Sequence, residues 1–318
     1  MDVLSSVING MRTGRPVTYR VECHAPWGRR FPRQSGVSLH VVLRGSCSLL
    51  PADGGEPLAL EMGDVALLPH GHAHAMAHAP DAPLEEKECV LSGEHCTPDG
   101  QAVVIGDPAP GGEPAAELVC GVYPLEQCNS HPVLEQLPES IHLRARLGHH
   151  PGLRAAVDML AAELAEPQLG GHALRSSLFD AVLMYSLRSW YAESCSGHTG
   201  WGDVLTDPVV GRALEAMHTH PERPWTIESL GAHVGLSRAA FARRFTGLVG
   251  QAPLAYLTWW RMSLAARLLR DTDAPVADVA RQAGYGSEFA FAGAFKREYR
   301  TTPARYRKRE AAAPRAVS

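Results

Sequence analysis

The sequence lacks any long apolar run, and its first residues lack an apolar segment. None of its 318 residues belongs to a run approaching the roughly 18–20 apolar residues that a membrane-spanning helix needs. The first 30 residues carry charged side chains at seven positions, so we expect no secretory signal. Hydrophobic residues make up 45% and charged residues 20% of the chain, which excludes wholesale disorder.

Cysteine is scarce and odd in number, with seven residues in the chain. An odd count without an export signal is typical of the reduced cytoplasm rather than of a disulfide scaffold. Cys23 and Cys89 each lie within two residues of a histidine or lysine, and a neighbouring cation favours the reactive thiolate. We therefore hypothesise a thiol switch that uses these two residues, with Cys96 as the resolving cysteine. The alternative, which fits Cys47 and Cys120, is that they are small buried hydrophobes.

Charge is unevenly divided along the chain. Residues 1–207 contain 13 Lys and Arg against 25 Asp and Glu, a net charge of −12. Residues 208–318 contain 17 Lys and Arg against 9 Asp and Glu, a net charge of +8. Such asymmetry suggests that the second part meets a polyanion. Chance together with a basic tail is the alternative, but the basic residues interleave with helical apolar positions throughout the segment.

The hydrophobic pattern divides the chain into three stretches. Up to about residue 147, short apolar runs alternate with Gly, Pro and Asp, which predicts an all-β sandwich or barrel. From about residue 151 to 201, apolar residues recur three and four positions apart, which predicts two helices in an αα-hairpin. The hairpin either packs on its own barrel or forms a dimer interface, and we favour the interface. From Pro208 onward the pattern is helical throughout.

The helical stretch contains two similar units. Each has an apolar helix, a glycine turn, a serine suited to cap the next helix, and two phenylalanines four residues apart. This pattern predicts a duplicated helix-turn-helix, a motif that places its second helix in the DNA major groove. The segment from Trp225 to Arg307 resembles the DNA-binding domain of the AraC/XylS family of transcription regulators. The residues that carry the resemblance lie in Trp225–Gly231, Gly235–Arg238, Phe241–Phe245, Gly250–Pro253, Tyr256–Leu269 and Val276–Arg307.

The resemblance implies which residues contact DNA. In the first unit the exposed face of the second helix carries Arg238, Ala239, Ala242 and Arg243. Arg243 is the leading base-reading candidate, because arginine can bond guanine through two parallel hydrogen bonds. A phosphate contact is the alternative for both arginines. In the second unit the corresponding face carries Glu288, Phe289, Ala292 and Gly293.

The second unit departs from the family at Gly293, where members often carry a long polar or basic side chain. This departure argues against strong base reading by the second unit. Phe289 either contacts a thymine methyl group or packs against the protein. Five further basic residues are expected to position the phosphate backbone, namely Lys296, Arg297, Arg300, Arg305 and Arg307.

The first stretch contains a spaced motif of Gly63, Pro69, Gly71 and His74, followed by His78. This spacing resembles the second cupin motif, with His78 in place of the closing asparagine, and the stretch is similar to the cupin sensor domain of one AraC-family subgroup. The first motif lacks its paired histidines, whose positions hold Gln34 and Gly36, and its glutamate position holds Ser38. A complete site of three histidines and one glutamate is therefore not supported.

Histidines nevertheless cluster in this stretch. Strand alternation turns His40 and Ser38 toward the same side, which should be the barrel interior. Neutral imidazole suits zinc or another transition metal, and nearby thiolates would add to the donor set. Two alternatives stay open: the histidines hydrogen-bond an organic effector, or they fill a polar barrel mouth. The candidates for a metal or effector site are His40, His72, His74 and His78.

Together these features predict an α+β multidomain protein. The expected parts are a cupin-like all-β sensor domain (1–147), a helical linker or dimerisation hairpin (148–207), an all-α domain with two helix-turn-helix units (208–310) and a flexible tail (311–318). The expected function is a DNA-binding transcription regulator whose cupin domain senses a metal, an oxidant or a small molecule. Its expected partners are double-stranded promoter DNA, RNA polymerase, a small effector and a second copy of the chain, in the cytoplasm and without a membrane.

Two other classes of function make different demands on the sequence. A cupin-type metal-dependent enzyme with an accessory helical domain would need an intact metal triad, which the first motif lacks. An architectural DNA binder with a vestigial barrel would need no pocket. No catalytic motif stands out, and the duplicated helix-turn-helix favours a regulator that is not an enzyme.

Overall fold

The computed structural model describes residues 2–85, 102–126, 130–146, 148–166, 168–194 and 200–312. These residues form two compact units. The sheet unit contains residues 14–85, 102–126, 137–146, 148–166 and 168–193, and the helical unit contains residues 2–13, 130–136 and 200–312. Within the described ranges, no helix combines the length and apolar character that crossing a bilayer requires.

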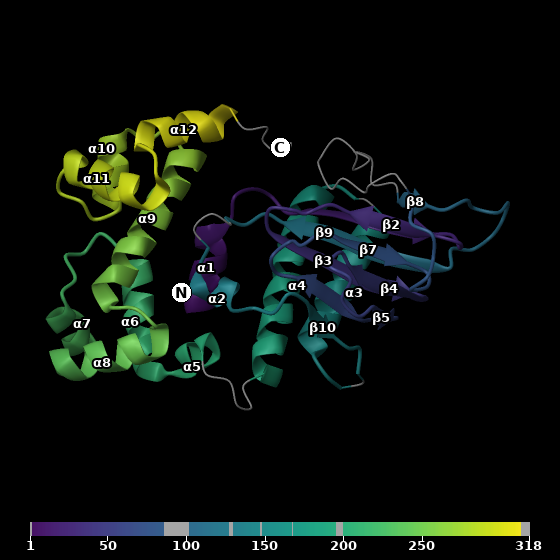
Figure 1. Cartoon of the computed structure of the whole chain (residues 1–318), viewed down its shortest axis with the longest axis horizontal. Coiled ribbons are helices and arrows are strands. Elements are labelled where there is room, and N and C mark those ends of the chain that lie inside the picture. The colour runs from purple at the N-terminus through teal and green to yellow at the C-terminus, as the bar shows by residue number, and fades with distance from the viewer. Residues whose placement is uncertain are drawn as a thin grey trace. The chain divides into compact units, whose positions relative to one another are not determined.

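Two β-sheets build the sheet unit and share one apolar core (Figure 1). The six-stranded sheet has the order β10-β6-β3-β9-β1-β8, and the four-stranded sheet has the order β2-β7-β4-β5. The strands are β1 Val17–Cys23, β2 Gly28–Phe31, β3 Val37–Arg44, β4 Ser46–Pro51, β5 Leu58–Glu61, β6 Val65–Leu68, β7 His74–Ala77, β8 Val103–Ile105, β9 Ala116–Tyr123 and β10 Ile141–Leu143.

Strand β3 lies inside the larger sheet, between β6 and β9. Its residues 37–42 are all buried, so both of its faces are covered, and two of these buried residues, Ser38 and His40, are polar. In the antiparallel register of β3 with β9, His40 lies opposite Cys120. In the smaller sheet, Phe31 of β2 lies opposite His74 of β7. These two pairings fix which side chains meet inside the core.

The predicted helical hairpin is present as α3 (Pro151–Ala165) and α4 (Gly171–Ser194). Five apolar residues of α3 are buried, including Leu153, Leu160 and Leu164, which follow the expected stripe. On α4, Phe179 is fully buried and its ring stacks on that of Tyr123 from β9, 6.2 Å away. The hairpin therefore packs on the sheet of its own unit.

The helical unit begins with a helix that the sequence analysis did not predict. Helix α1 (Val3–Met11) starts at Asp2, whose carboxylate accepts the Ser5 amide proton, and it buries an apolar face. Arg267 and Arg270 of α9 donate to the carbonyl oxygens of Asn9 and Arg12 at the end of this helix. The remaining helices are α2 Pro132–Glu135, α5 Trp201–Thr206, α6 Pro208–Thr219, α7 Ile227–His233, α8 Arg238–Val249, α9 Pro253–Asp271, α10 Val276–Gln282, α11 Glu288–Tyr299 and α12 Pro303–Ala312.

The duplicated helix-turn-helix is confirmed as α7–α8 and α10–α11. Both turns use a glycine in the left-handed region, Gly235 with φ +77° and Gly284 with φ +78°. In each, the residue after the glycine donates its amide proton to the carbonyl five residues earlier at 2.8 Å, from Leu236 in the first turn and from Tyr285 in the second. The predicted class, a β-rich first part and an all-helical last part, is therefore confirmed.

Candidate functional site

Helix α8 presents the first candidate DNA-contacting face. Ser237 caps the helix by accepting the Ala240 amide proton, and Phe241 and Phe245 anchor its inner side in the core. On the outer side Arg238, Ala239 and Arg243 are exposed and Ala242 is half-buried. Arg238 pairs with Glu228 of α7 at 2.8 Å. Within the described residues, Arg243 has no hydrogen-bond or ion-pair partner, so its guanidinium is available to a ligand.

Arg244, the neighbour of Arg243 on α8, is exposed but forms an ion pair within the protein. Arg244 donates from two nitrogens to the Asp207 carboxylate, at 2.6 and 3.1 Å. The same carboxylate caps α6 by accepting amide protons from Val209 and Val210. These bonds and the Arg244 charge hold the pKa of Asp207 below its usual range, although its partial burial acts the other way. Arg244 therefore joins α8 to the start of α6, whereas its neighbour Arg243 has no such ion pair within the described part of the chain.

Helix α11 presents the matching face of the second unit. Ser287 caps it through the Ala290 amide, and Phe291 and Phe295 are fully buried. Glu288 and Gly293 are exposed, Ala292 is half-buried, and Phe289 is 90% exposed. Packing against the protein was one expectation for Phe289, and this exposure leaves its ring free to meet another molecule.

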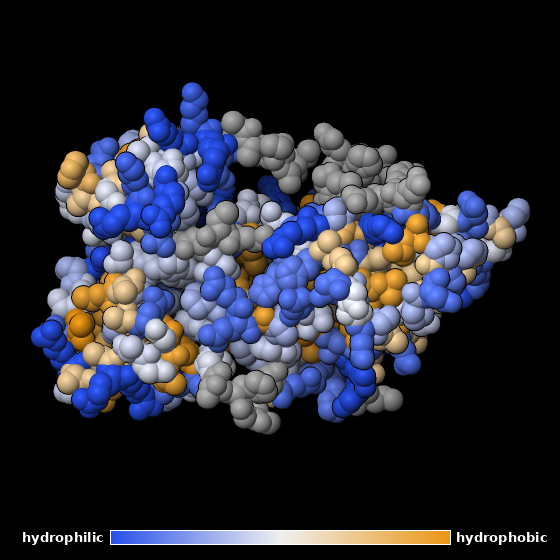
Figure 2. All heavy atoms as spheres, viewed as in Figure 1, coloured by the Kyte–Doolittle hydropathy of each residue, from blue (hydrophilic) through white to orange (hydrophobic). Residues whose placement is uncertain are grey.

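The basic residues expected at phosphates fall into two groups. Lys296, Arg297, Arg300 and Arg305 are exposed, and the surface over α12 is mostly hydrophilic (Figure 2). Arg307 is half-buried and donates to the carbonyl oxygens of Leu269 and Ala274, where α9 ends. Basic side chains often satisfy the last carbonyl groups of a helix in this way. The structure therefore gives the Arg307 guanidinium an internal partner.

The sheet unit brings two of the four candidate histidines together. His40 and His74 come from different sheets, and their Nε2 atoms lie 2.8 Å apart in the core. The other ring nitrogen of His40 lies 3.1 Å from the sulfur of Cys120. Phe31 stacks on His74 with ring centroids 5.0 Å apart. Sequence reasoning did not connect Cys120 with His40, because the pairing depends on the register of strands 80 residues apart.

Burial and hydrogen bonding together determine which atoms of Cys120, His40 and His74 carry protons. Burial lowers the pKa of His74 to about 4 and that of His40 well below its ordinary value, so both rings are neutral at pH 7. His74 Nδ1–H donates to the His72 carbonyl oxygen, so its Nε2 accepts. His40 must then donate from Nε2, which leaves its Nδ1 to accept the Cys120 S–H. The Cys120 thiol proton therefore lies at one end of a hydrogen-bond relay that runs through His40 to His74.

A cupin-type metal would need more ligands than this pair supplies. Each Nε2 atom is engaged by the other ring, and among the described residues no third His, Cys, Asp or Glu completes a group with them. Ser38, at the position of the cupin glutamate, is buried with an unpartnered hydroxyl, and Gln34 donates to the Pro32 carbonyl oxygen. The residues present therefore do not fit the metal centre of that motif.

The other two candidate histidines lie elsewhere. His72 pairs with Glu139 at 3.4 Å, beside a cleft of about 390 Å³ lined also by Leu49, Leu68 and Asp53. His78 places its Nδ1 2.8 Å from the Trp27 carbonyl oxygen.

The redox candidates are placed only in part. Cys23 is fully buried at the end of β1, and Cys89 and Cys96 lie outside the described residues. Of the two cysteines expected to be buried, Cys120 is the one joined to His40. Burial, together with the Asp64 charge, raises the pKa of Cys47 to about 12, which makes its thiol unreactive at neutral pH.

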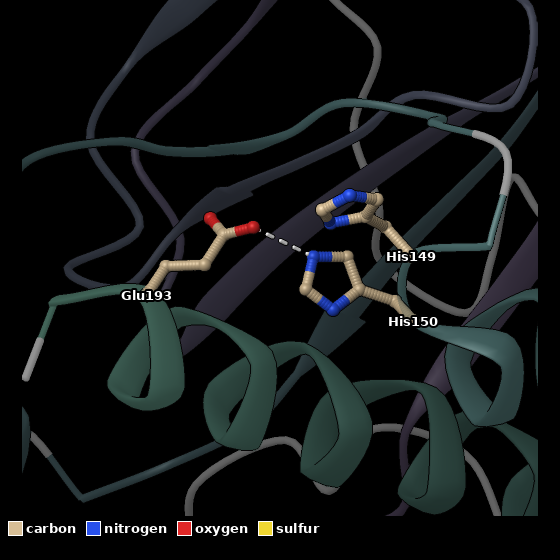
Figure 3. Close-up of side chains that lie close together, drawn as sticks. All are labelled: His149, His150 and Glu193. Atoms are coloured by element: carbon tan, nitrogen blue, oxygen red, sulfur yellow. Dashed lines mark hydrogen bonds and ion pairs between the residues drawn. The ribbon is translucent and has the colours of Figure 1, made fainter.

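A second cluster was missed by the sequence analysis because its members come from distant segments. His149 and His150 precede α3, and Glu193 lies in the last turn of α4 (Figure 3). One ligand atom from each lies within 4.8 Å of the other two. A cleft of about 590 Å³ adjoins both histidines.

The helical unit contains a third group of buried polar side chains, which sequence reasoning also missed. Tyr256 bonds His131 at 2.8 Å and His218 at 2.6 Å through its hydroxyl. His131 Nδ1 accepts the Val133 amide proton, so its Nε2 donates to Tyr256 and the tyrosine hydroxyl donates to His218. Burial lowers the pKa of His218 to about 3 and that of His131 well below its ordinary value.

Comparisons with known proteins cover both units. A family profile described as cupin matches residues 2–192, and one described as a helix-turn-helix domain matches residues 230–309. A putative AraC-like transcription regulator of Streptomyces lividans is 31% identical over 97% of this chain and 98% of its own length. The RCS-specific HTH-type transcriptional activator RclR of Escherichia coli is 30% identical over 86% of this chain and 85% of its own.

Among the solved structures that match part of the chain is the crystal structure of the DNA-binding domain of AdpA in complex with a target DNA. The match is 36% identical and covers 34% of this chain and 97% of that one, with a TM-score of 0.33.

Proposed function

The chain belongs to the AraC-like transcription regulators with an N-terminal cupin domain, and we propose that it is a sequence-specific, effector-responsive member. Its two helix-turn-helix units bind successive major-groove segments of double-stranded promoter DNA. The sheet unit binds the effector, and the signal changes DNA binding or the recruitment of RNA polymerase. We place this activity in the cytoplasm and assign the active form to a homodimer.

One observation carries the proposal for DNA. The two units repeat the same turn geometry and the same buried phenylalanine pair, so α8 and α11 are equivalent elements on one scaffold. The outer face of α8 offers Arg243, which has no partner among the residues that the structure describes, and arginine in the major groove discriminates guanine. The exposed Phe289 of α11 suits an apolar contact with a thymine methyl group.

The effector proposal rests on the sheet unit. Its core holds the relay from Cys120 through His40 to His74, and its surface holds two clefts. A ligand that engages either feature can shift regulation only if it binds one state of the protein more tightly than the other. For an oxidant as effector, we propose Cys23 and Cys89 as the reacting pair and Cys96 as the resolving residue. Because Cys23 is fully buried, its oxidation requires local opening at the end of β1.

Selection of duplexes from a random library, with the full-length protein, tests the DNA proposal. The expected result is one enriched motif whose footprint shows two protected major-groove segments about one helical turn apart. Affinity should fall steeply with salt, because phosphate contacts release counterions. Tight binding without an enriched motif would instead support an architectural DNA binder and would overturn sequence-specific regulation.

A reporter assay tests the effector proposal. A promoter that carries the selected motif should respond to one of three treatments, namely zinc, a mild oxidant or an organic ligand. If Cys23→Ser and Cys89→Ser variants keep the full response to oxidant, the thiol switch fails. A reporter that responds to none of the three treatments would remove the effector from the proposal while leaving DNA binding in place.

A further inference from the structure

The open end of the α3–α4 hairpin holds a group of potential metal ligands that the proposed function does not use. His150 Nε2 lies 2.8 Å from a Glu193 carboxylate oxygen, and the His149 ring lies 6.0 Å from the His150 ring, centre to centre. Figure 3 shows the two rings and the carboxylate turned toward one another. Among the described residues, these three alone meet the spacing expected of a metal site, with all ligand atoms within 4.8 Å.

The backbone of α3 and α4 positions these three side chains. Gly152, in the first turn of α3, lies so close to α4 that a Cβ atom there would come within 2.5 Å of the Tyr185 ring. The absence of a side chain at Gly152 permits this close contact, which brings the start of α3 near the last turns of α4. Glu193 lies about two turns beyond Tyr185 on the same helix.

His150 adopts a left-handed conformation, with φ 51° and ψ 50°, just before α3. Such a conformation costs a non-glycine residue on the order of 1–3 kcal/mol. Helix capping does not account for this conformation, because the His150 side chain makes no cap hydrogen bond to α3. Neighbouring side chains diverge in a helix or strand, whereas here both histidines face the same carboxylate.

The kind of donor selects the kind of ion. Two neutral imidazole nitrogens and one carboxylate oxygen are a ligand set that zinc accepts, with bonds of about 2.0–2.2 Å. Calcium and magnesium prefer sites made of oxygen atoms alone. We propose that His149, His150 and Glu193 bind a zinc ion, or a divalent transition metal of the same class. The His150 and Glu193 ligand atoms, now 2.8 Å apart, would separate to admit the ion, and His149 is the third ligand, with its ligand atom within 4.8 Å of both.

Three protein ligands leave one tetrahedral position open. The cleft of about 590 Å³ that both histidines line gives this position room for water or a small anion. Arg144, Arg146 and Arg154 line the same cleft. Arg154 pairs with Asp158, which also lines it, so Arg144 and Arg146 are the cations that favour an anion as the fourth ligand. The site is separate from the buried pair of His40 and His74, whose Nε2 atoms are already bonded to each other.

Titration of the metal-stripped, full-length protein with zinc chloride tests this site. Calorimetry with a competing chelator gives the stoichiometry and affinity, and cobalt chloride gives a visible absorption band that reports the coordination. We expect one high-affinity equivalent. His149→Ala and Glu193→Gln should each weaken zinc binding by at least the roughly 10- to 100-fold that the loss of an outer-shell partner costs.

Matched controls keep the result interpretable. His172→Ala removes an exposed histidine from the first turn of α4 and should leave zinc binding unchanged. Glu193→Gln keeps a side chain that can bond His150, so its circular dichroism should match that of the wild type. Zinc should raise the melting temperature of the wild type more than that of Glu193→Gln, because tighter binding to the folded state gives a larger stabilisation.

Three outcomes would overturn the proposal. The wild type takes up no zinc, or both variants bind zinc as the wild type does, or binding is lost in His74→Ala but kept in Glu193→Gln. The last result would place the ion in the buried core instead. None of these measurements involves DNA, so the metal site stands or fails separately from the proposed regulation.

Discussion

The two helix-turn-helix units have the same scaffold but different outer faces. Both recognition helices start at a serine cap, and both pack two phenylalanine rings at nearly equal distances, 5.6 Å in α8 and 5.7 Å in α11. The outer face of α8 carries Arg243, and the equivalent position of α11 is Gly293. The duplication therefore preserves the residues that hold each recognition helix in place, whereas the outward-facing residues differ between the two helices.

Their interiors differ as well. The core of the second unit consists of aliphatic and aromatic side chains such as Val279, Ala294 and Tyr306. Around the first unit, Phe245 contacts Tyr256, which is bonded to the buried histidines His131 and His218. Residue 131 reaches this core from the segment between strands β9 and β10 of the chain. The first unit thus depends on a titratable polar network, whereas the described core of the second does not.

Lowering the pH should produce the largest difference between the two units, because it should destabilise the first unit much more than the second. The folded-state pKa of His218 is about 3, against about 6.5 in an unfolded chain, so the folded state binds fewer protons below neutral pH. The folding stability linked to His218 is present above its unfolded-state pKa of about 6.5 and is lost progressively as the pH falls from there toward 3. His218 alone should cost about 2 kcal/mol between pH 7 and pH 5, and His131 acts in the same direction.

Hydrogen exchange by mass spectrometry, corrected for intrinsic rates, measures this difference. Peptides from α6 should lose protection at pH 5, and peptides from α10 and α11 should lose much less. Equal loss in both would show that the helical unit opens as one body, and the contrast between the interiors would then have no energetic meaning.

The contrast between the outer faces predicts unequal base reading. Arg243→Ala should weaken binding to the selected DNA by about 1–3 kcal/mol and relax specificity at one base pair. Arg243→Lys should keep much of the affinity but lose the discrimination, because an ammonium cannot form the two parallel bonds. Binding measurements on duplexes mutated one position at a time test both variants. A uniform loss across all duplexes would reduce Arg243 to a phosphate contact.

Local patterns explain what the sequence could predict. The helix-turn-helix units were readable because their glycine turns, serine caps and phenylalanine spacing lie within about 20 residues of one another. The inward direction of His40 followed from strand alternation alone. Helix α1 was missed although Asp2 is a good cap, because nine residues give too short a stripe for a periodic pattern to stand out.

Side-chain partners across long separations were not readable. The contact of His40 with Cys120 needs the register of two strands, and that of His150 with Glu193 needs the crossing of two helices. Arg307 matches the family pattern as a basic residue near DNA, yet its partners are carbonyl groups 33 and 38 residues earlier. Sequence spacing indicates which face a residue occupies, but not what another segment brings to meet it.

A smaller effect should come from the glycine that sets the two faces apart. Gly293→Ala should stabilise the helical unit by about 0.5–1 kcal/mol, because glycine inside a helix costs that much relative to alanine. A Cβ atom there would have Arg297 Nη1 as its nearest neighbour at 3.9 Å, so nothing must move. Gly247→Ala in α8, where a Cβ atom meets nothing within 4 Å, is the matched change. Chemical denaturation should show similar gains, and a loss in either variant would mean that the scaffolds are not equivalent.

The smallest effects should come from the exposed cations near the second unit. Arg300→Ala should weaken all duplexes about equally and should lower the slope of log affinity against log salt by about one, because one phosphate contact disappears. Residue 300 is already left-handed with φ 57°, and alanine is no worse there than arginine, so stability should change little. Arg307→Ala is the informative counterpart, since it removes bonds to the Leu269 and Ala274 carbonyl oxygens. It should lower the melting temperature and leave the salt slope unchanged. If the two variants exchanged these behaviours, Arg307 would be the residue at the phosphate, and the second unit would contact DNA through a different part of its surface.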